Sequence, residues 1–476
     1  MAGLFTRREK VHATQLPLPE SQAWPALIAL CVGFFMILLD QTIVSVATPA
    51  LRENLNASYN DVIWVTSAYL LTFAVPLLVT GRLGDRFGPR TLYMSGMAVF
   101  TLSSLACGLS TSMAALIISR AVQGLGASML VPQTMSVINR IFAKERRGAA
   151  LGVWGMTAGL AGLTGPILGG VITQTIGWEW IFFINVPFGI LSLLMVWRYV
   201  PVFPRTQRKV DPASIVLSVI AVFLLVFGLQ QGETVGWAWW IWVTIAFGLA
   251  FAAAFVAQQN RAERKGNDPL MPLELFGFHN FSMGNIGIFA MGFVVAGTPL
   301  PIMLYLQNVH GLSPLAAGSM MIPQAITALV LSPFVGRLAD RYSANRLAAG
   351  GFATTAVSYF LFFAIMQWDL PLWLVLVAMF INGLGSSFVW APNSTSTMHD
   401  LSPQLMGVGS GVYNTTRQLG SVLGSAAIGA VLQWRVGATG LGQAYGQAVI
   451  AAAIVLGLGV WAALSAHQRS ARQSSR

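Results

Sequence analysis

The sequence predicts an all-α polytopic membrane protein with fourteen transmembrane helices, on three observations. The chain of 476 residues is 55% hydrophobic and only 9% charged, whereas soluble domains carry about a quarter charged residues. Its apolar residues form fourteen runs that are long enough to cross a bilayer core of about 30 Å. Its basic residues fall mainly in every second loop. The net charge of +11 is therefore explained by membrane topology, and no nucleic-acid partner is expected.

The apolar runs give the expected helices in chain order. They lie at 24–46, 59–79, 91–109, 113–140, 148–174, 178–201, 212–232, 238–259, 281–305, 314–335, 346–367, 370–398, 405–434 and 446–466. Because their number is even, both chain ends are expected on the same side. Placing that side in the cytoplasm puts 23 of the 27 basic residues into cytoplasmic loops and tails, as the positive-inside rule requires. We expect an uncleaved signal-anchor helix first, in a bacterial plasma membrane.

An internal repeat divides the chain. The segments GRLGDRFGPR at 81–90 and GRLADRYSANR at 336–346 share a GRLxDR core, and each follows a proline-bearing run. If 24–201 and 281–466 each form a six-helix bundle, both segments are the second loop of their bundle. The two helices within 202–280 are then an inserted pair, and 1–23 and 467–476 are cytoplasmic tails. Two parallel repeats around a central cavity are a known transporter architecture.

One acid, Asp40, stands inside the first apolar run, in the segment LDQTIVSVATP at 39–49. An acid at bilayer depth costs roughly 2.5–3.5 kcal/mol on insertion scales, so it usually serves a function. A carboxyl group in a low dielectric favours its neutral form and can exchange a proton near neutral pH. The alternative is that Asp40 only caps or pins the end of its helix.

Two arginines, Arg120 and Arg417, also lie within apolar runs. Asp40 and Arg120 fall at a similar depth when residues are counted from their helix ends at about 1.5 Å each, so we expect them to pair. Alternatively, Arg120 bonds to carbonyl groups or extends toward the outer surface. Several amides, with Arg417, are expected to line a cavity or to bond between helices: Gln41, Gln123, Gln307, Asn382, Asn393 and Asn414.

Each GRLxDR segment is expected to act as a cytoplasmic latch. Its glycine would permit a tight turn between two helices, and its acid would accept hydrogen bonds from helix amides and nearby arginines. Such a cluster can form in one conformation and break in the other. The alternative is a solvated basic loop. The expected latch residues are Gly81, Asp85, Arg86, Arg90, Gly336, Asp340 and Arg341.

A glycine-rich run, GMTAGLAGLTGPILGG, occupies 155–170. We expect its glycines to give one flat helix face for close backbone packing, and Pro166 to favour a kink. This face is interpreted as a rocking interface between helices, with ordinary small-residue packing as the alternative. The glycines expected on this face are Gly155, Gly159, Gly162, Gly165 and Gly169, and Gly170 ends the run.

Together these motifs resemble the major facilitator superfamily, in particular its fourteen-helix drug:proton antiporter branch. The first-helix motif matches at 39–49, although Ser45 and Thr48 replace the usual asparagine and leucine. In WEWIF, Glu179 replaces the usual arginine, so no role is carried over to that charge. The loop motif matches at Gly81, Asp85, Arg86, Gly88 and Arg90. The fourth-helix motif matches at Arg120, Gln123, Gly124 and Gly126. The antiporter motif matches at Gly155, Gly159, Gly165, Pro166, Gly169 and Gly170.

The resemblance implies alternating access, with amphipathic drugs or other lipophilic small molecules leaving as protons enter. A lipid or lysolipid flippase or exporter on the same fold, a proton-coupled uptake symporter and a non-transporting membrane scaffold are the alternatives. The sequence has no phosphate loop, nucleophile–base arrangement or metal motif, so we expect no ATP-driven pump, enzyme, cofactor or metal site. The expected partners are the small substrate, protons and membrane lipids, and the chain is expected to be a monomer.

Overall fold

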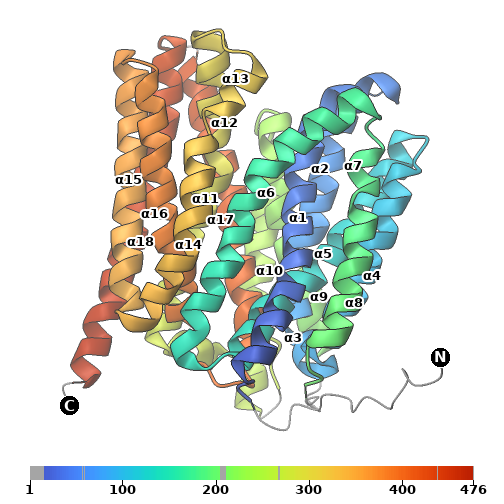
Figure 1. Cartoon of the computed structure of the whole chain (residues 1–476), viewed down its shortest axis with the longest axis vertical. Helices are drawn as coiled ribbons and strands as arrows, with labels where there is room; N and C mark the ends of the chain where they lie inside the picture. The colour runs from blue at the N-terminus through green and yellow to red at the C-terminus, as the bar shows by residue number, and fades with distance from the viewer. Residues whose placement is uncertain are drawn as a thin grey trace.

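The computed structural model describes residues 16–55, 57, 59–203, 211–265, 268–436 and 438–474. Within these ranges the regular secondary structure is helical and no β-strand forms (Figure 1). Thirteen of the described helices are long and apolar enough to cross a membrane, and a bent pair, Trp64–Ala74 with Leu77–Phe87, supplies a fourteenth span. The predicted all-α fold is therefore confirmed.

The helices follow one another closely along the chain. In order, they are α1 (Glu20–Asn54), α2 (Tyr59–Ala74), α3 (Leu77–Phe87), α4 (Pro89–Gly108), α5 (Met113–Ile141), α6 (Arg147–Thr175), α7 (Trp180–Phe183), α8 (Asn185–Tyr199), α9 (Pro212–Thr234), α10 (Trp239–Arg264), α11 (His279–Gly297), α12 (Pro299–Leu304), α13 (Pro314–Ser319), α14 (Ile322–Arg341), α15 (Ala344–Trp368), α16 (Trp373–Met398), α17 (Met406–Val436) and α18 (Leu441–Ser474). Short 3₁₀ or π turns lie at η1 (Lys144–Arg146), η2 (Leu273–Gly277) and η3 (Tyr305–Val309).

The local sequence explains several helix ends. Proline cannot donate a backbone hydrogen bond, and Pro76 lies at the break where α2 and α3 meet at 47°. Gly88, at φ 91°, makes the turn from α3 into α4, and Pro89 begins α4, as their backbone preferences allow. The hydroxyl of Ser112 caps α5 by accepting a hydrogen bond from the amide of Ala115, a typical N-cap.

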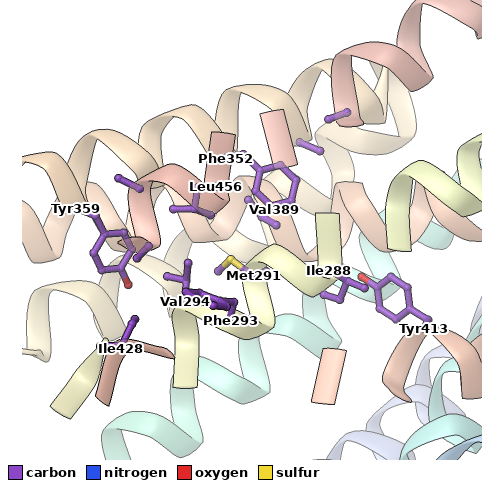
Figure 2. Close-up of a cluster of buried hydrophobic side chains, with 14 of the residues drawn as sticks. Ile288, Met291, Phe293, Val294, Phe352, Tyr359, Val389, Tyr413, Ile428 and Leu456 are labelled. Carbon is purple, nitrogen blue, oxygen red and sulfur yellow. The ribbon is translucent and has the colours of Figure 1, made fainter. Parts of the chain in front are cut away.

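The helices form two bundles. In Figure 1, α1–α8 (blue to green) lie on one side and α11–α18 (yellow to red) on the other. One buried hydrophobic cluster is drawn almost wholly from the first set and includes Phe34, Tyr93 and Trp154. In the second set, side chains of α11, α15, α16, α17 and α18 meet in another cluster (Figure 2), which Leu78, Val79 and Met135 of the first set join. Each bundle therefore has a core made mostly of its own side chains.

The bundles approach each other backbone to backbone at the end where α3 and α14 terminate, here called the basic end. A methyl group added at Gly81 of α3 would lie 2.8 Å from the carbonyl oxygen of Gly407 in α17. One added at Gly336 of α14 would lie 2.3 Å from the carbonyl oxygen of Gly148 in α6. The expectation that Gly81 and Gly336 form turns is wrong, because the helices continue through both GRLxDR segments. Their missing side chains allow close helix packing instead.

The helices α9 and α10 lie beside the bundles. Val226 of α9 is buried with Leu71 of α2, and Leu419 and Val422 of α17 pack on the same cluster. Gly248 of α10 lies against Leu225 of α9. The helix α9 therefore covers the seam between α2 and α17, with α10 outside it.

Candidate functional site

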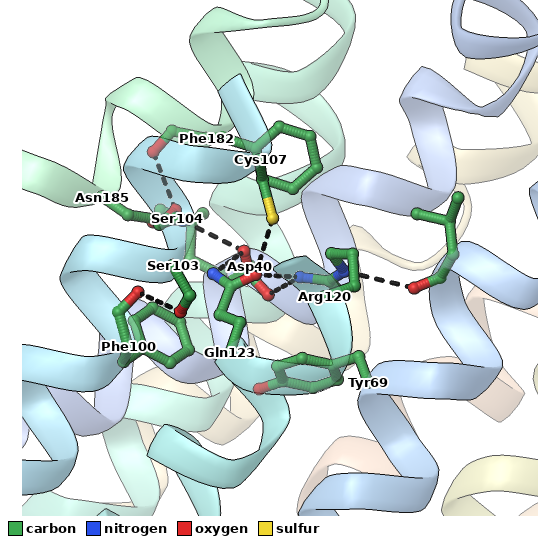
Figure 3. Close-up of polar contacts among 12 residues, drawn as sticks. Asp40, Tyr69, Phe100, Ser103, Ser104, Cys107, Arg120, Gln123, Phe182 and Asn185 are labelled. Carbon is green, nitrogen blue, oxygen red and sulfur yellow. Dashed lines mark hydrogen bonds and ion pairs between the residues drawn. The ribbon is translucent and has the colours of Figure 1, made fainter. Parts of the chain in front are cut away.

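The carboxylate of Asp40 is fully buried among α1, α5 and α8 (Figure 3). Its Oδ2 accepts a 2.6 Å hydrogen bond from Nη1 of Arg120, and the two groups form an ion pair. Its Oδ1 accepts bonds of 3.0 Å from Nε2 of Gln123 and from Nδ2 of Asn185. The structure thus brings the three residues Asp40, Arg120 and Gln123, singled out from the sequence, into one buried cluster.

The guanidinium of Arg120 is satisfied on several sides. Besides the bond to Asp40, Nε donates to the carbonyl oxygen of Val65 at 3.2 Å, and Nη1 also donates to Oε1 of Gln123 at 2.6 Å. The rings of Tyr69 and Phe182 lie 4.2 and 5.8 Å from its central carbon. A buried charge is tolerated only with such partners. Arg120 therefore does not extend toward the outer surface.

Sequence reasoning missed three members of this cluster. Asn185 also donates to Oγ of Ser104 at 3.1 Å, and Ser104 donates to the carbonyl oxygen of Phe182 at 2.9 Å. The thiol of Cys107 lies 3.7 Å from Oε1 of Gln123. Asn185 belongs to the segment WEWIFFINVPFG, which the sequence suggested only as the start of a helix near the outer surface. Asn185 in fact begins α8 and is fully buried.

Asp40 stands further from its helix end than expected. The first helix was predicted to stop at 46, but α1 continues to Asn54, because the backbone stays helical beyond the apolar run. Asp40 is therefore well inside α1 and cannot serve as its cap. The next side chain, Gln41, is half-buried.

Both predicted latch acids bridge the bundles at the basic end. Asp85 accepts a 2.6 Å bond from Nη2 of Arg140 and a 3.1 Å bond from the amide of Val408, in the first turn of α17. Asp340 accepts bonds of 2.6 and 2.8 Å from the amides of Gly148 and Ala149, in the first turn of α6. Each carboxylate therefore meets the positively polarised start of a helix in the opposite bundle.

The three arginines predicted for the latch lie elsewhere. Arg86 and Arg341 are exposed, and Arg90 donates to the carbonyl oxygen of Trp197. Because the GRLxDR segments are helical, a residue directly after the acid points to another side of the helix. Among the described contacts, Arg140 of α5 takes the place that the sequence assigned to these arginines.

The comparison with known proteins identifies the family. The profile of the Major Facilitator Superfamily matches residues 30–425. The chain belongs to the Major Facilitator Superfamily. It is 45% identical over 415 residues to an uncharacterized MFS-type transporter of Mycobacterium tuberculosis, which covers 87% of this chain and 71% of that protein. It is 34% identical over 420 residues to the tetracenomycin C resistance and export protein of Streptomyces glaucescens, which covers 88% of this chain and 77% of that protein.

A solved structure supports the same fold. The chain aligns with a human organic anion transporter at a TM-score of 0.68 and 15% identity, over 92% of this chain and 100% of the other. Membership of the superfamily makes the chain a multi-pass membrane transporter and not an enzyme.

The glycine-rich run of this transporter lies in α6 and does not form one flat face. A methyl group added at Gly159 would lie against α14, 3.3 Å from the amide nitrogen of Leu329. A methyl group added at Gly165 would instead lie against α1, 2.0 Å from Oγ1 of Thr42. At Gly162 and Gly170 added methyl groups would meet no atom within 4 Å. The expectation of a single packing face is wrong, because α6 changes neighbours along its length. Gly155, Pro166 and Gly169 lie on the same helix.

The polar residues of the second bundle are mostly bonded between or within helices. Asn382 donates to Oγ of Ser358 at 3.0 Å, and Asn393 donates to the carbonyl oxygen of Gly284 and to the hydroxyl of Tyr413. The other predicted members are Asn414, which donates to the carbonyl oxygen of Ser410, and Gln307, which is half-buried in η3. Arg417 differs from all of these, as shown below.

Proposed function

We propose that this transporter is a proton-coupled antiporter that exports amphipathic drugs or other lipophilic small molecules by alternating access. The observation that carries the proposal is the buried ion pair of Asp40 and Arg120 inside a membrane-spanning bundle. Export is the direction that the name of the Streptomyces glaucescens relative, a resistance and export protein, also describes.

The coupling step is a change of charge at Asp40. When the carboxylate takes up a proton, it loses the charge that holds Arg120 and the amides of Gln123 and Asn185. Charge-assisted hydrogen bonds are stronger than neutral ones, so protonation weakens the links among α1, α5 and α8. Those three helices would then shift relative to one another, and the ion pair would re-form when the proton leaves.

Alternating access would use the contacts at the basic end. Asp85 and Asp340 each accept amide hydrogen bonds from the opposite bundle, and the glycine pairs allow the helices to touch there. We assign these contacts to the state that is closed at this end. Separation of the bundles would break both sets together.

The topology of the proposal follows the positive-inside rule. We assign the basic end and both chain ends to the cytoplasmic side of a bacterial plasma membrane, so the state closed at the basic end would be closed toward the cytoplasm. We assign 24–201 and 281–466 to two six-helix bundles and 202–280 to the inserted pair with its linkers. The tails are 1–23 and 467–476. Residues 1–15 and 475–476 of the tails, and residues 204–210 and 266–267 of the segment with the inserted pair, lie outside the described residues.

The driving force is sufficient for export. One proton crossing about 100 mV supplies about 2.3 kcal/mol, and one pH unit adds roughly 1.4 kcal/mol. The sum supports a gradient of a few hundred-fold for a neutral substrate exchanged against one proton.

The test is dye uptake into inverted membrane vesicles under an imposed proton gradient, with ethidium as the dye. Wild type should accumulate dye until an uncoupler is added, and Asp40→Asn should not. The matched control is Asp369→Asn, because Asp369 is a 76% exposed acid at φ 47°, a conformation that asparagine tolerates. Uptake that survives Asp40→Asn would place the proton path elsewhere. Absence of gradient-driven uptake by well-inserted wild type would reject drug export of this kind.

A further inference from the structure

We infer that Arg417 anchors a negatively charged group of the transported molecule, so that the substrates include amphipathic organic anions. This inference rests on the proposed transport function and names a substrate class for it. It starts from a charge for which the described residues supply no counter-ion.

Arg417 lies inside the membrane-spanning helix α17 and is half-buried. Within the part of the chain that the structure describes, its guanidinium has no ion pair and no hydrogen-bond acceptor. Among the described residues, the ionisable side chain that acts on it electrostatically is that of Tyr413, one helical turn away. A guanidinium at membrane depth is costly unless an anion or a set of acceptors meets it.

Two arginines of the first bundle have an acid of the chain as their partner. Arg120 is paired with Asp40, and Arg140 with Asp85, each at 2.6 Å. Both acids belong to the chain itself. An anionic group of another molecule would play the same part for Arg417.

Helix geometry gives the direction of the side chain. On α17, Gly407 and Gly411 face α3, Leu419 and Val422 face α9, and Gly420 and Gly424 face α11. At about 100° of rotation per residue around the axis of α17, Arg417 is turned roughly 170° away from Leu419 and Val422, the residues that face α9. It is turned only about 40° away from Gly420 and Gly424, the residues that face α11, in the direction of the face that meets α3. Arg417 therefore points to the space between α11 and the first bundle, away from the inserted pair.

The helix α6 of the first bundle, which is equivalent to α17, has open space beside it at this level. Gly148 of α6 and Gly407 of α17 occupy equivalent places, because each lies against the latch acid of the opposite bundle. Counted from these two glycines, Gly162 is equivalent to Ser421, one turn beyond Arg417. A methyl group added at Gly162 would meet no atom within 4 Å. Gly162 is exposed, so α6 has open space beside it at the height where a ligand of Arg417 would lie.

The charges of the site favour an anion. Asp40, the membrane-embedded acid of the first bundle, is already neutralised by Arg120. The planar guanidinium of arginine offers two parallel donors to a carboxylate or sulfonate. Lipophilic molecules that carry one such group are therefore included among the substrates.

The test is equilibrium binding to the full chain in phosphatidylcholine nanodiscs. The probes are 1-anilinonaphthalene-8-sulfonate and its uncharged parent, N-phenyl-1-naphthylamine, which differ by the sulfonate. Arg417→Gln should weaken binding of the sulfonate by about tenfold or more and leave the parent within about twofold. Arg417→Lys should retain much of the preference. Arg435→Gln, which removes the same charge near the end of the same helix, should behave like wild type.

Three results would overturn the inference: unchanged sulfonate binding in Arg417→Gln, equal weakening of both probes, or no preference for the sulfonate in wild type. Equal weakening would mean a structural role. Adding phosphatidylglycerol to the discs separates a lipid headgroup from a small anion, because selective loss of sulfonate binding there would assign the site to lipid and reject this substrate class. The vesicle assay is independent of this one: a lack of gradient-driven ethidium uptake rejects the proposed export of that cationic dye, whereas the binding assay reports on Arg417 alone.

Discussion

A single methyl group at Gly152 should open the basic end of the transporter. Gly152 of α6 faces α14, and an added Cβ would lie 2.5 Å from the carbonyl oxygen of Ser332 and 2.9 Å from Cα of Gly336. Both neighbours are backbone atoms, so neither can turn away. To reach an ordinary contact of 3.4 Å, the two helices must separate by roughly 0.9 Å.

The cost falls on one conformation. Overpacking of a close contact costs about 1–3 kcal/mol, which corresponds to a change in equilibrium of about fivefold to more than a hundredfold. The state in which the basic end is open does not have this contact, so its population relative to the closed state should rise by that factor. Gly162→Ala on the same helix is the matched control, because its methyl group meets no atom within 4 Å. Both substitutions carry the same gain in helix propensity, up to about 1 kcal/mol.

The population can be measured with spin labels across the basic end. Phe87 and Tyr342 belong to opposite bundles and are 45% and 64% exposed, so labels on Phe87→Cys and Tyr342→Cys would report the separation. The native Cys31 and Cys107 are buried. Gly152→Ala should add a population with a longer distance between the two labels to the distribution measured by double electron–electron resonance. A profile indistinguishable from that of Gly162→Ala would refute the packing argument.

Two further predictions concern acids near helix starts. Asp85→Asn removes the charge that meets Arg140 and the amide of Val408, so it should weaken the closed state by about 1.5–3 kcal/mol. Transport into vesicles should be slower, while membrane insertion stays the same. Unchanged transport rates would show that Asp85 is not a latch. Hydrogen bonds, chiefly from the hydroxyl of Ser214, lower the pKa of Asp211 at the start of α9. Its stabilisation should be complete above the ordinary aspartate pKa of about 3.9 and fade as the pH falls through the lowered value. Asp211→Ala should therefore cost about 0.5–2 kcal/mol at pH 7, and the difference in thermal stability from wild type should shrink in acid.

Much of this protein was determined by the sequence alone. The fourteen spans could be predicted because each helix must be apolar over the thickness of the bilayer, which is a local property of the chain. The encounter of Asp40 and Arg120 could be predicted because buried charges seek partners and few residues share their depth. The repeat predicted that Asp85 and Asp340 accept hydrogen bonds from helix amides, which they do.

The tertiary structure alone decided which particular groups meet. Asn185 reaches Asp40 across 145 positions of the chain, and Val408 reaches Asp85 across 323, and no local pattern encodes such distances. The glycines of α6 face different partners because the crossing of helices sets their neighbours, not their spacing. Arg417 remained one polar residue among several until the structure showed that the described residues around it include no acid partner. Packing between helices that are distant in the sequence determines these contacts, because complementary shapes and charges come together only when the bundles are assembled.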